Sequence, residues 1–568
     1  MSALAGVWSR RVDPRIVENM LAAVAHRGQR VQTTQVGVTA MGARDGLVHA
    51  TRGLVLVGDV RIDNRAELLA ALRLPATATD AELLLAAYEA WDTACPARLL
   101  GDFAFVIGDQ VRHRLFCARD PFGVKPFYYH SDGDGGLAFA TRIASLFQVP
   151  GVPREIDPDR TRGYLEATFD DPAATLYRGI HRLPPAHTLT LVPGMARIQR
   201  YWHPADAPDI RYASDDDYAA ALRDIFVEAV RCRLGGAGPC GALLCGGLDS
   251  SSIVSVARLL LEQRGAAPLH TFSATFESVP ECDERPFIQS IIAGGGVSAH
   301  FVAGDRLDPF DDLDHMLDAE DEVPCAPNLF VHWALYRAAR EAGVCVLFDG
   351  LDGDTAISHG VSHITQLARN GRIGRAGIES VLLARRLGQP VWTVMRRRMV
   401  APFVPDFVRR ALGRPLPPAT ARARTEREDH AARLTSPLVP MALEIADRAS
   451  AAWRIEARYP FFDRRIADFC IGLPPEQKLR DGWTRYILRR AMDGILPRSV
   501  QWRGGKSSLA PNFVRAVRHG LDRRPFMNPA DLRLCNERRW SHADALALWR
   551  HSSLHAWLSR QEQPTPPS

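Results

Sequence analysis

The stretch Leu243-Leu-Cys-Gly-Gly-Leu-Asp-Ser-Ser251 is the part of this 568-residue chain that most constrains its fold. Its apolar start is typical of a buried strand, and residues 253–261 have the composition of a helix. Two adjacent glycines let main-chain amides approach an anion without a Cβ in the way. The positive end of the following helix points at the same place. The stretch therefore predicts a phosphate-binding turn, and it is not a Walker A loop, because no Gly-Lys-Ser/Thr follows.

The polar side chains of this turn suit a magnesium-bound phosphate. Ser250, Ser251 and Ser252 add hydroxyl donors. Asp249 stands where a carboxylate would hold Mg²⁺ against phosphate oxygens, since Mg²⁺ prefers oxygen ligands. The alternative interpretation is a turn with a structural role only.

Strands alternate with helices after this turn. Residues 270–276 and 344–348 are strand candidates, and Ser214 is the expected N-cap of a helix with acids at positions 215–217. Alternating strands and helices predict a parallel sheet covered on both faces. Ligands of such sheets bind beyond the carboxyl ends of the strands, where the glycine-rich turns fall.

The first part of the chain has a different pattern. Short apolar runs at 53–58, 103–107 and 115–118 predict strands, and prolines at 204 and 208 mark a linker. We therefore expect two domains, residues 1–205 and 206–568.

Residues 365–430 of the second domain are rich in arginine and poor in acids, and a proline-rich segment at 415–418 interrupts them. One interpretation is a basic helical insertion that faces an acidic peptide or phosphates, and the other is a set of solvated helices.

The composition excludes several classes of protein. Hydrophobic residues make up 46% and charged residues 24%, as in ordinary globular proteins, and the net charge of +5 is too small for a general nucleic-acid coat. The ten cysteines form no CxxC pair, so zinc sites and redox dithiols lack their spacing, and we expect buried thiols in a reducing cytosol. No signal-peptide segment and no run of about 18 apolar residues is present. The sequence thus predicts a cytoplasmic protein that binds neither membrane nor nucleic acid.

The phosphate-binding turn resembles the pyrophosphate loop SGGLDSS of the N-type ATP pyrophosphatases, and specifically of the asparagine synthetase family, with Cys245 in place of the first serine. Residues 347–354 (LFDGLDGD) resemble the second loop of that family, LLSGEGADE, and residues 456–463 (EARYPFFD) resemble EARVPFLD. The resemblance covers nearly the whole chain outside the arginine-rich insertion. In the first domain, the matching stretches are residues 80–84, 100–105 and 119–128.

The resemblance implies an α/β fold. An N-terminal Ntn-hydrolase-like, glutaminase-like αββα domain would precede an adenine-nucleotide α-hydrolase-like (PP-loop) synthetase domain with a parallel sheet. It implies ATP and Mg²⁺ as cofactors, Asp249 and Asp354 as metal ligands, and Lys506 as the lysine that contacts the activated intermediate. The nucleotide contacts that it implies are Leu243, Cys245, Gly246, Gly247, Leu248, Asp249, Ser250, Ser251, Ser273, Asp349 and Gly350. The alternatives are a helix cap for Asp354, a mobile surface lysine for Lys506 and no direct role for Asp349.

The first domain departs from a working glutaminase of this family. Ser2 stands where the family has a cysteine after the initiator Met, although serine serves as the nucleophile in other enzymes of that fold. The oxyanion pair Asn-Gly is replaced by Val57-Gly58, and loss of one oxyanion donor costs roughly 10²–10³ in rate. We therefore expect a scaffold, in which Arg119, Asp120 and Lys125 form structural ion pairs.

A synthetase without an ammonia source needs an amine that its substrate already carries, which is the logic of the cyclising branches of the family. Residues 474–486 and 502–506 resemble lasso peptide cyclases, and the arginine-rich insertion suits a bulky peptide. Leu351 stands where β-lactam synthetases place a catalytic tyrosine. The expected function is ATP-dependent macrolactam formation, in which a ribosomal precursor peptide has an Asp or Glu side chain adenylated and joined to its N-terminal amine, with release of AMP and pyrophosphate.

Glu456 is the expected base for that amine, and its alternative is an ion pair with Arg458. The implied partners are a leader-binding protein and a leader peptidase. Two other functions stay open: a small-molecule amide or β-lactam synthetase, and a non-catalytic scaffold. His26, His270 and His359 have no ligand-like partners in the sequence, so satisfied or exposed histidines are expected there.

Overall fold

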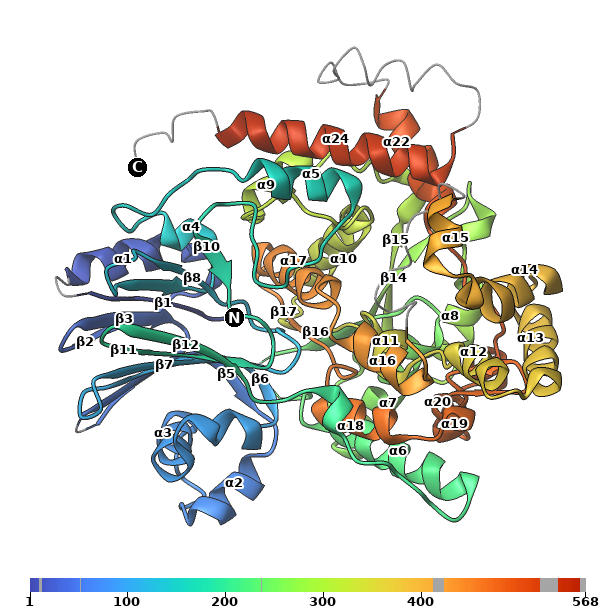
Figure 1. The fold of residues 1–568 in the computed structure, drawn as a ribbon, viewed down its shortest axis with the longest axis horizontal. Coiled ribbons are helices and arrows are strands. Elements are labelled where there is room, and N and C mark those ends of the chain that lie inside the picture. The colour runs from blue at the N-terminus through green and yellow to red at the C-terminus, as the bar shows by residue number, and fades with distance from the viewer. Residues whose placement is uncertain (10–12, 52, 236–237, 412–422, 522–539, 562–568) are drawn as a thin grey trace.

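The computed structural model describes residues 1–9, 13–51, 53–235, 238–411, 423–521 and 540–561. A β-rich N-terminal half lies beside an α/β C-terminal half, and the N-terminus lies where the two halves meet (Figure 1). The predicted boundary at residue 205 falls in the short helix η3 (Pro204–Asp206), before α6 (Asp215–Arg231).

The N-terminal half is built on two stacked antiparallel sheets of six strands each. The first has the order β10 (Ile180–Arg182), β8 (Tyr128–Ser131), β9 (Leu137–Ala140), β1 (Ala3–Trp8), β3 (Thr39–Arg44), β2 (Val31–Val36). The second has the order β12 (Met195–Arg200), β11 (His187–Val192), β7 (Arg114–Arg119), β6 (Gly101–Asp109), β5 (Leu54–Ile62), β4 (Leu47–Ala50). The expected strands at 53–58, 103–107 and 115–118 are confirmed as parts of β5, β6 and β7.

Helices cover both outer faces of this sandwich. Helices α1 (Pro14–Ala22) and α4 (Ile143–Leu146) pack on the first sheet, and α2 (Arg65–Leu72) and α3 (Asp80–Trp91) pack on the second. Apolar side chains such as Leu4, Val57 and Phe127 fill the space between the sheets. The αββα layering expected from the resemblance is therefore present.

The C-terminal half contains an all-parallel sheet. Its strands have the order β15 (Val297–Ala303), β14 (Leu269–Thr275), β13 (Cys240–Leu243), β16 (Val346–Phe348), β17 (Glu456–Arg458). One apolar cluster joins the sheet to α6, α7 (Leu248–Gln263), α8 (Arg285–Ile292), α18 (Arg464–Gly472) and α20 (Tyr486–Ala491). A second joins it to α9 (Leu313–Ala319), α10 (Leu329–Glu341), α17 (Leu438–Ala452), α22 (Ala510–Leu521) and α24 (His542–Gln561). Helix α24 also packs on α5 (Pro158–Glu166) of the first half.

Two helix starts show how local sequence shapes this half. Ser214 is the N-cap of α6, as predicted: its Oγ accepts from the amide of Asp217, whose carboxylate accepts from the Ser214 amide. Helix α7 begins at Leu248, five residues earlier than predicted, so the motif's aspartate and serines lie in its first turn.

The predicted insertion is helical where it is described. It contains α12 (Ser362–Arg369), α13 (Ile373–Leu387), α14 (Val391–Met395), a π-helical turn (Arg396–Val400), η7 (Ala401–Phe403), α15 (Asp406–Ala411) and α16 (Glu426–Leu434). Helices α12 to α14 share a small apolar core with Leu479 of the hairpin β18 (Leu479–Arg480) and β19 (Trp483–Thr484). The proline segment 415–418, Arg414 and Arg422 lie outside the described residues.

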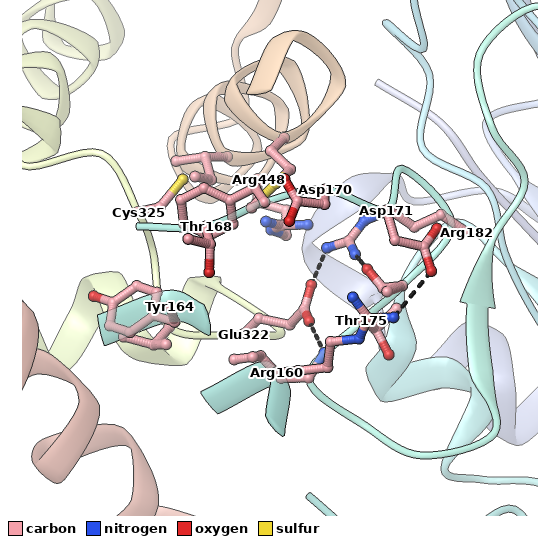
Figure 2. Close-up of a pocket in the computed structure, with 16 residues that line it drawn as sticks. Arg160, Tyr164, Thr168, Asp170, Asp171, Thr175, Arg182, Glu322, Cys325 and Arg448 are labelled. Atoms are coloured by element: carbon pink, nitrogen blue, oxygen red, sulfur yellow. Dashed lines mark hydrogen bonds and ion pairs between the residues drawn. The ribbon is translucent and has the colours of Figure 1, made fainter. Parts of the chain in front are cut away.

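Buried ion pairs join the two halves. Glu444 on α17 accepts from Arg119 (2.9 Å), from the Tyr128 hydroxyl (2.7 Å) and from Arg182 (2.8 Å), all in the N-terminal half. Figure 2 shows Arg182 directed at Glu322 in a cavity that Arg448 also lines. Because these charged groups satisfy one another, we regard this cavity as part of the interface.

The observed contacts of Arg119, Asp120 and Lys125 differ in detail from the predicted ion pairs. Arg119 pairs across the interface, whereas Lys125 pairs within its domain with Asp59 at 3.0 Å. Asp120 forms no ion pair among the described residues and instead accepts from four main-chain amides, those of residues 122–125.

The nine described cysteines form no disulfide, and Cys535 lies outside the described residues. In the described part of the chain, the helices are all too short or too polar to cross a membrane.

Candidate nucleotide site

The turn after β13 has the open main chain that an anion requires. Gly246 has a φ of +69°, and a Cβ there would stand 2.9 Å from the Phe287 Cβ, so only glycine fits. A Cβ on Gly247 would stand 3.6 Å from the Lys506 Cε, which places the lysine beside the loop. The amides at the start of α7 are therefore accessible to a phosphate and lie next to a cation.

The three serines of the turn do not act alike. Ser250 Oγ accepts from the Cys245 amide at 3.2 Å and so holds the loop closed, and Ser252 Oγ donates to the Leu248 carbonyl at 2.7 Å. Ser251 Oγ is buried without a hydrogen-bond partner among the described residues. Of the predicted hydroxyl donors, Ser251 is therefore the one that its surroundings leave unsatisfied.

The second loop closes directly onto the first. A Cβ on Gly350 would stand 3.1 Å from the Ser250 amide nitrogen, and one on Gly353 would stand 3.0 Å from the Asp249 Cγ. Asp354 lies in the first turn of α11 (Gly353–Ile357) and lines the same cleft as Asp249. The structure thus brings together the two aspartates that the sequence analysis assigned to metal.

Each of these aspartates has a cationic or imidazole partner that the sequence analysis missed. Arg485 Nη1 lies 2.8 and 2.6 Å from the two oxygens of Asp249. His359 Nε2 lies 2.9 Å from Asp354 Oδ2, so His359 is a hydrogen-bonded histidine, as expected, but its partner is the predicted metal ligand, which the sequence did not indicate. Burial raises the pKa of Asp354, but the His359 hydrogen bond, with the charges of His359, Arg485 and Lys506, outweighs it and lowers that pKa well below its usual range.

The other acids of the second loop are harder to ionise. Burial, with the charges of Asp354, Asp349 and Asp249, raises the pKa of Asp352 to about 6. Burial also raises the pKa of Asp349, whose Oδ2 has no hydrogen-bond partner within the described chain. An unsatisfied buried carboxylate oxygen at the carboxyl end of β16 suits a nucleotide or metal contact.

Lys506 lies on an anchored segment. Glu284 accepts from Arg503 (2.6 Å) and from the Ser507 amide (2.8 Å), which fixes both flanks of the lysine. The nearby sulfur of Cys245 and the carboxylates of Asp249, Glu284 and Asp354 raise the pKa of Lys506, so it is charged. Leu243 ends β13, and Ser273 lies two residues before the end of the neighbouring strand β14, but neither lines the cleft that contains Lys506.

The cleft has a volume of about 360 Å³, within the range of small-molecule sites. Lys506, Arg503 and Arg485 line it together with Arg489 of α20 and Arg398 of the insertion. These cations outnumber the acids Asp249, Asp354 and Asp429 that also line it. The cleft is therefore suited to a polyanion.

Glu456 does not lie in this cleft. It is at the amino end of β17, in register with Val346, and it lines a separate small cavity between the two halves. Arg458 Nε donates to Glu456 Oε1 at 2.8 Å, which was the alternative interpretation. Burial raises the pKa of Glu456, but Lys125 and Arg458 outweigh it and lower that pKa to about 2. Such an acid is a poor proton acceptor near neutral pH, and the structure argues against Glu456 as the base.

The cavity beside Ser2 has no room for glutamine. Asp59, Lys125 and Glu456 line it together with Met1 and Ser2, and its volume is about 10 Å³, room for about one water. Ion pairs of Arg27 with Asp447 and of Lys125 with Asp59 close it from both halves.

Two curated relatives match most of the chain. It is 27% identical to "Asparagine synthetase [glutamine-hydrolyzing] 3" of Bacillus subtilis over 75% of this chain and 70% of that protein. It is also 27% identical to "Putative asparagine synthetase [glutamine-hydrolyzing]" of Mycobacterium tuberculosis over 78% of this chain and 73% of that protein. Among solved structures, the B. subtilis glutamine PRPP amidotransferase gives a TM-score of 0.28 at 13% identity, over 53% of this chain and 80% of that one, which is too low to support an inference.

Two family models divide the chain between them. Residues 1–202 match the glutamine amidotransferase domain, and residues 221–563 match asparagine synthase. The second match covers more than half of the chain and contains the turn, the second loop and Lys506. The chain therefore belongs to the asparagine synthase family, as an ATP-dependent, amide-forming ligase.

Proposed function

We propose that this ligase closes a macrolactam in a peptide. An Asp or Glu side-chain carboxylate of a ribosomal precursor peptide attacks the α-phosphorus of ATP, which gives an acyl-adenylate and pyrophosphate. The N-terminal amine of the same peptide then attacks the acyl carbon, and AMP leaves. The supporting observation is a contrast between two cavities of the chain. The predicted loops and Lys506 line a nucleotide cleft of about 360 Å³, while the cavity beside Ser2 has room for about one water.

The residues of the cleft fit ATP with Mg²⁺. Asp249 and Asp354 offer carboxylate oxygens from adjacent loops, the ligand type that Mg²⁺ prefers. When bound, Mg²⁺ would neutralise charge on the departing pyrophosphate. The amides at the start of α7 bind phosphate oxygens, and Lys506 offsets their charge. The contacts of Arg485 and His359 orient the two carboxylates.

The attacking amine does not depend on Glu456. An α-amine has a pKa near 8, so a useful fraction is neutral at the pH of a cell. A peptide held with its amine over the acyl carbon reacts with a high effective molarity. The enzyme then acts mainly by activating the carboxylate and positioning the amine.

The test of this proposal uses the leader-free form of a short precursor peptide encoded beside the gene. Purified enzyme with this peptide, ATP and Mg²⁺ should yield a peptide that is lighter by one water. One AMP should be released for each peptide that is cyclised. Asp249→Asn should yield neither. AMP without a dehydrated peptide would contradict the proposal, and pyrophosphate exchange stimulated by a small amino diacid but not by peptide would identify a small-molecule amide or β-lactam synthetase.

The proposal implies two protein partners, a leader-binding protein and a leader peptidase. They would deliver the peptide and expose its N-terminal amine. If the proposal holds, full-length precursor should cyclise only when both proteins are added, while the leader-free peptide should cyclise without them.

A further inference from the structure

The insertion carries an unusual concentration of exposed apolar side chains. Of the fifteen large hydrophobic residues that are exposed in the described part of the chain, six lie between residues 373 and 407. The most exposed are Phe407 (73%), Trp392 (67%) and Ile378 (61%). These six residues are spread over consecutive short helices of one segment, and exposed apolar groups concentrated in this way indicate an interaction surface.

The same segment is strongly basic. Residues 365–408 contain eight arginines but only two acids, Glu379 and Asp406. Glu379 is buried, and its carboxylate accepts from the amides of Asp481 and Gly482. Five exposed arginines form no ion pair with any described residue: Arg372, Arg375, Arg385, Arg396 and Arg397.

Basic and apolar exposed groups alternate along α13 and the segment that follows it. The exposed residues of α13 follow helical spacing: Ile378 lies three residues after Arg375, and Arg385 lies seven residues after Ile378. The buried residues Ala376 and Leu383 of the same helix belong to the small core of the insertion. Trp392, Arg396 and Arg397 follow in α14 and in the π-helical turn. We call the six exposed apolar residues (Ile373, Ile378, Trp392, Val400, Phe403 and Phe407) and the five unpaired arginines the insertion surface.

The inner side of the same insertion lines the nucleotide cleft, through Leu387 and Arg398. A peptide whose reacting end lies in the cleft would therefore pass beside the insertion where it leaves the cleft. We propose that the insertion surface binds an acidic, apolar-containing segment of the peptide substrate. This inference rests on the proposed function, and its basis is charge complementarity together with the shared wall of the cleft.

The experiment measures binding without ATP, by fluorescence anisotropy. The probe is a fluorescein-labelled 12-residue peptide of Glu, Leu and Phe, and its counterpart has Lys in place of Glu. Wild-type enzyme should bind the acidic probe and not the basic one. The R396E/R397E variant should bind it at least about tenfold more weakly, and Trp392→Ser should also weaken it. The matched control is R197E/R200E, which reverses two exposed arginines on β12 of the N-terminal half.

Several results would overturn the inference. They are equal binding of both probes, unchanged binding by R396E/R397E and Trp392→Ser, or equal loss in R197E/R200E. Binding to phosphatidylglycerol vesicles that R396E/R397E abolishes would assign the surface to a membrane instead.

Thermal melting monitored by circular dichroism shows whether each variant is folded, and R375E/R385E is a second variant for the same surface. Because the assay needs no turnover, the proposed ligase reaction can fail while probe binding holds, and the reverse can also be observed.

Discussion

Lys506 is one of three cations beside the phosphate-binding turn, together with Arg485 and Arg503, and we expect the site to use its positive charge. We expect Lys506→Met to slow peptide-dependent ATP–pyrophosphate exchange by roughly 10²-fold, the usual effect of removing one preorganised electrostatic contact. The melting temperature should stay nearly unchanged, because the side chain is exposed. Lys506→Arg should retain more activity than Lys506→Met, and equal activity of the two variants would argue against an electrostatic role.

Site residues that belong to a local sequence motif could be predicted, whereas residues that meet only through the fold could not. Asp249, Asp354 and Lys506 could be predicted because each stands in or beside a motif. Arg485 could not, because it meets Asp249 across 236 positions of sequence. Glu456 matched its motif yet lies in another cavity, since its place at the amino end of β17 directs it away from the carboxyl edge where nucleotides bind.

The N-cap of α6 allows a stability effect to be separated from activity. Ser214→Ala removes the hydroxyl that accepts from the Asp217 amide, and should lower the free energy of unfolding by about 1 kcal/mol. Urea denaturation measures this change. Catalysis should be unaffected, because the cap does not line the nucleotide cleft. Ser214→Asp restores an accepting oxygen and should recover most of the loss; a Ser214→Ala variant as stable as the wild type would show that the capping box contributes nothing.

Elements with strong local signals were predictable. The strands 103–107 and 115–118 and the N-cap of α6 are set by apolar runs and a capping pattern, and they are found where expected. The start of α7 was placed too late, because Asp and Ser disfavour helix interiors but are well suited to a first turn. The exposed apolar side of the insertion could not be predicted, because a periodic pattern does not show which face lacks a partner.

Glu444 is central to the junction between the two halves of the molecule. Burial raises its pKa, but Arg182, Arg119 and Arg448 outweigh burial and lower it to about 2. Because the folded-state pKa is below the unfolded value of about 4.3, its stabilising effect is complete above that value and is lost as the pH falls toward 2. Glu444→Gln leaves buried arginines uncompensated, and should cost about 3–5 kcal/mol at pH 7.

The measurement for this prediction is urea denaturation from pH 7 down to pH 2. The difference between wild type and Glu444→Gln should shrink below about pH 4.3, because the carboxylate of the unfolded chain binds its proton there, whereas the folded carboxylate stays ionised until the pH approaches 2. The exposed Glu166→Gln serves as the control, and should stay within about 0.5 kcal/mol of wild type throughout. A constant difference across the pH range would show that the ionisation of Glu444 does not stabilise the interface.

We propose that two loops of the C-terminal half build one metal-dependent nucleotide site. The most direct measurement is isothermal titration with α,β-methylene-ATP in the presence of Mg²⁺. Wild-type enzyme should bind one equivalent, and the Asp249→Asn/Asp354→Asn variant should bind at least about tenfold more weakly, since even the loss of an outer-shell partner costs 10–100-fold in metal affinity. Binding of equal strength by the two proteins, or no binding by the wild type, would show that the two loops do not form a metal-dependent nucleotide site.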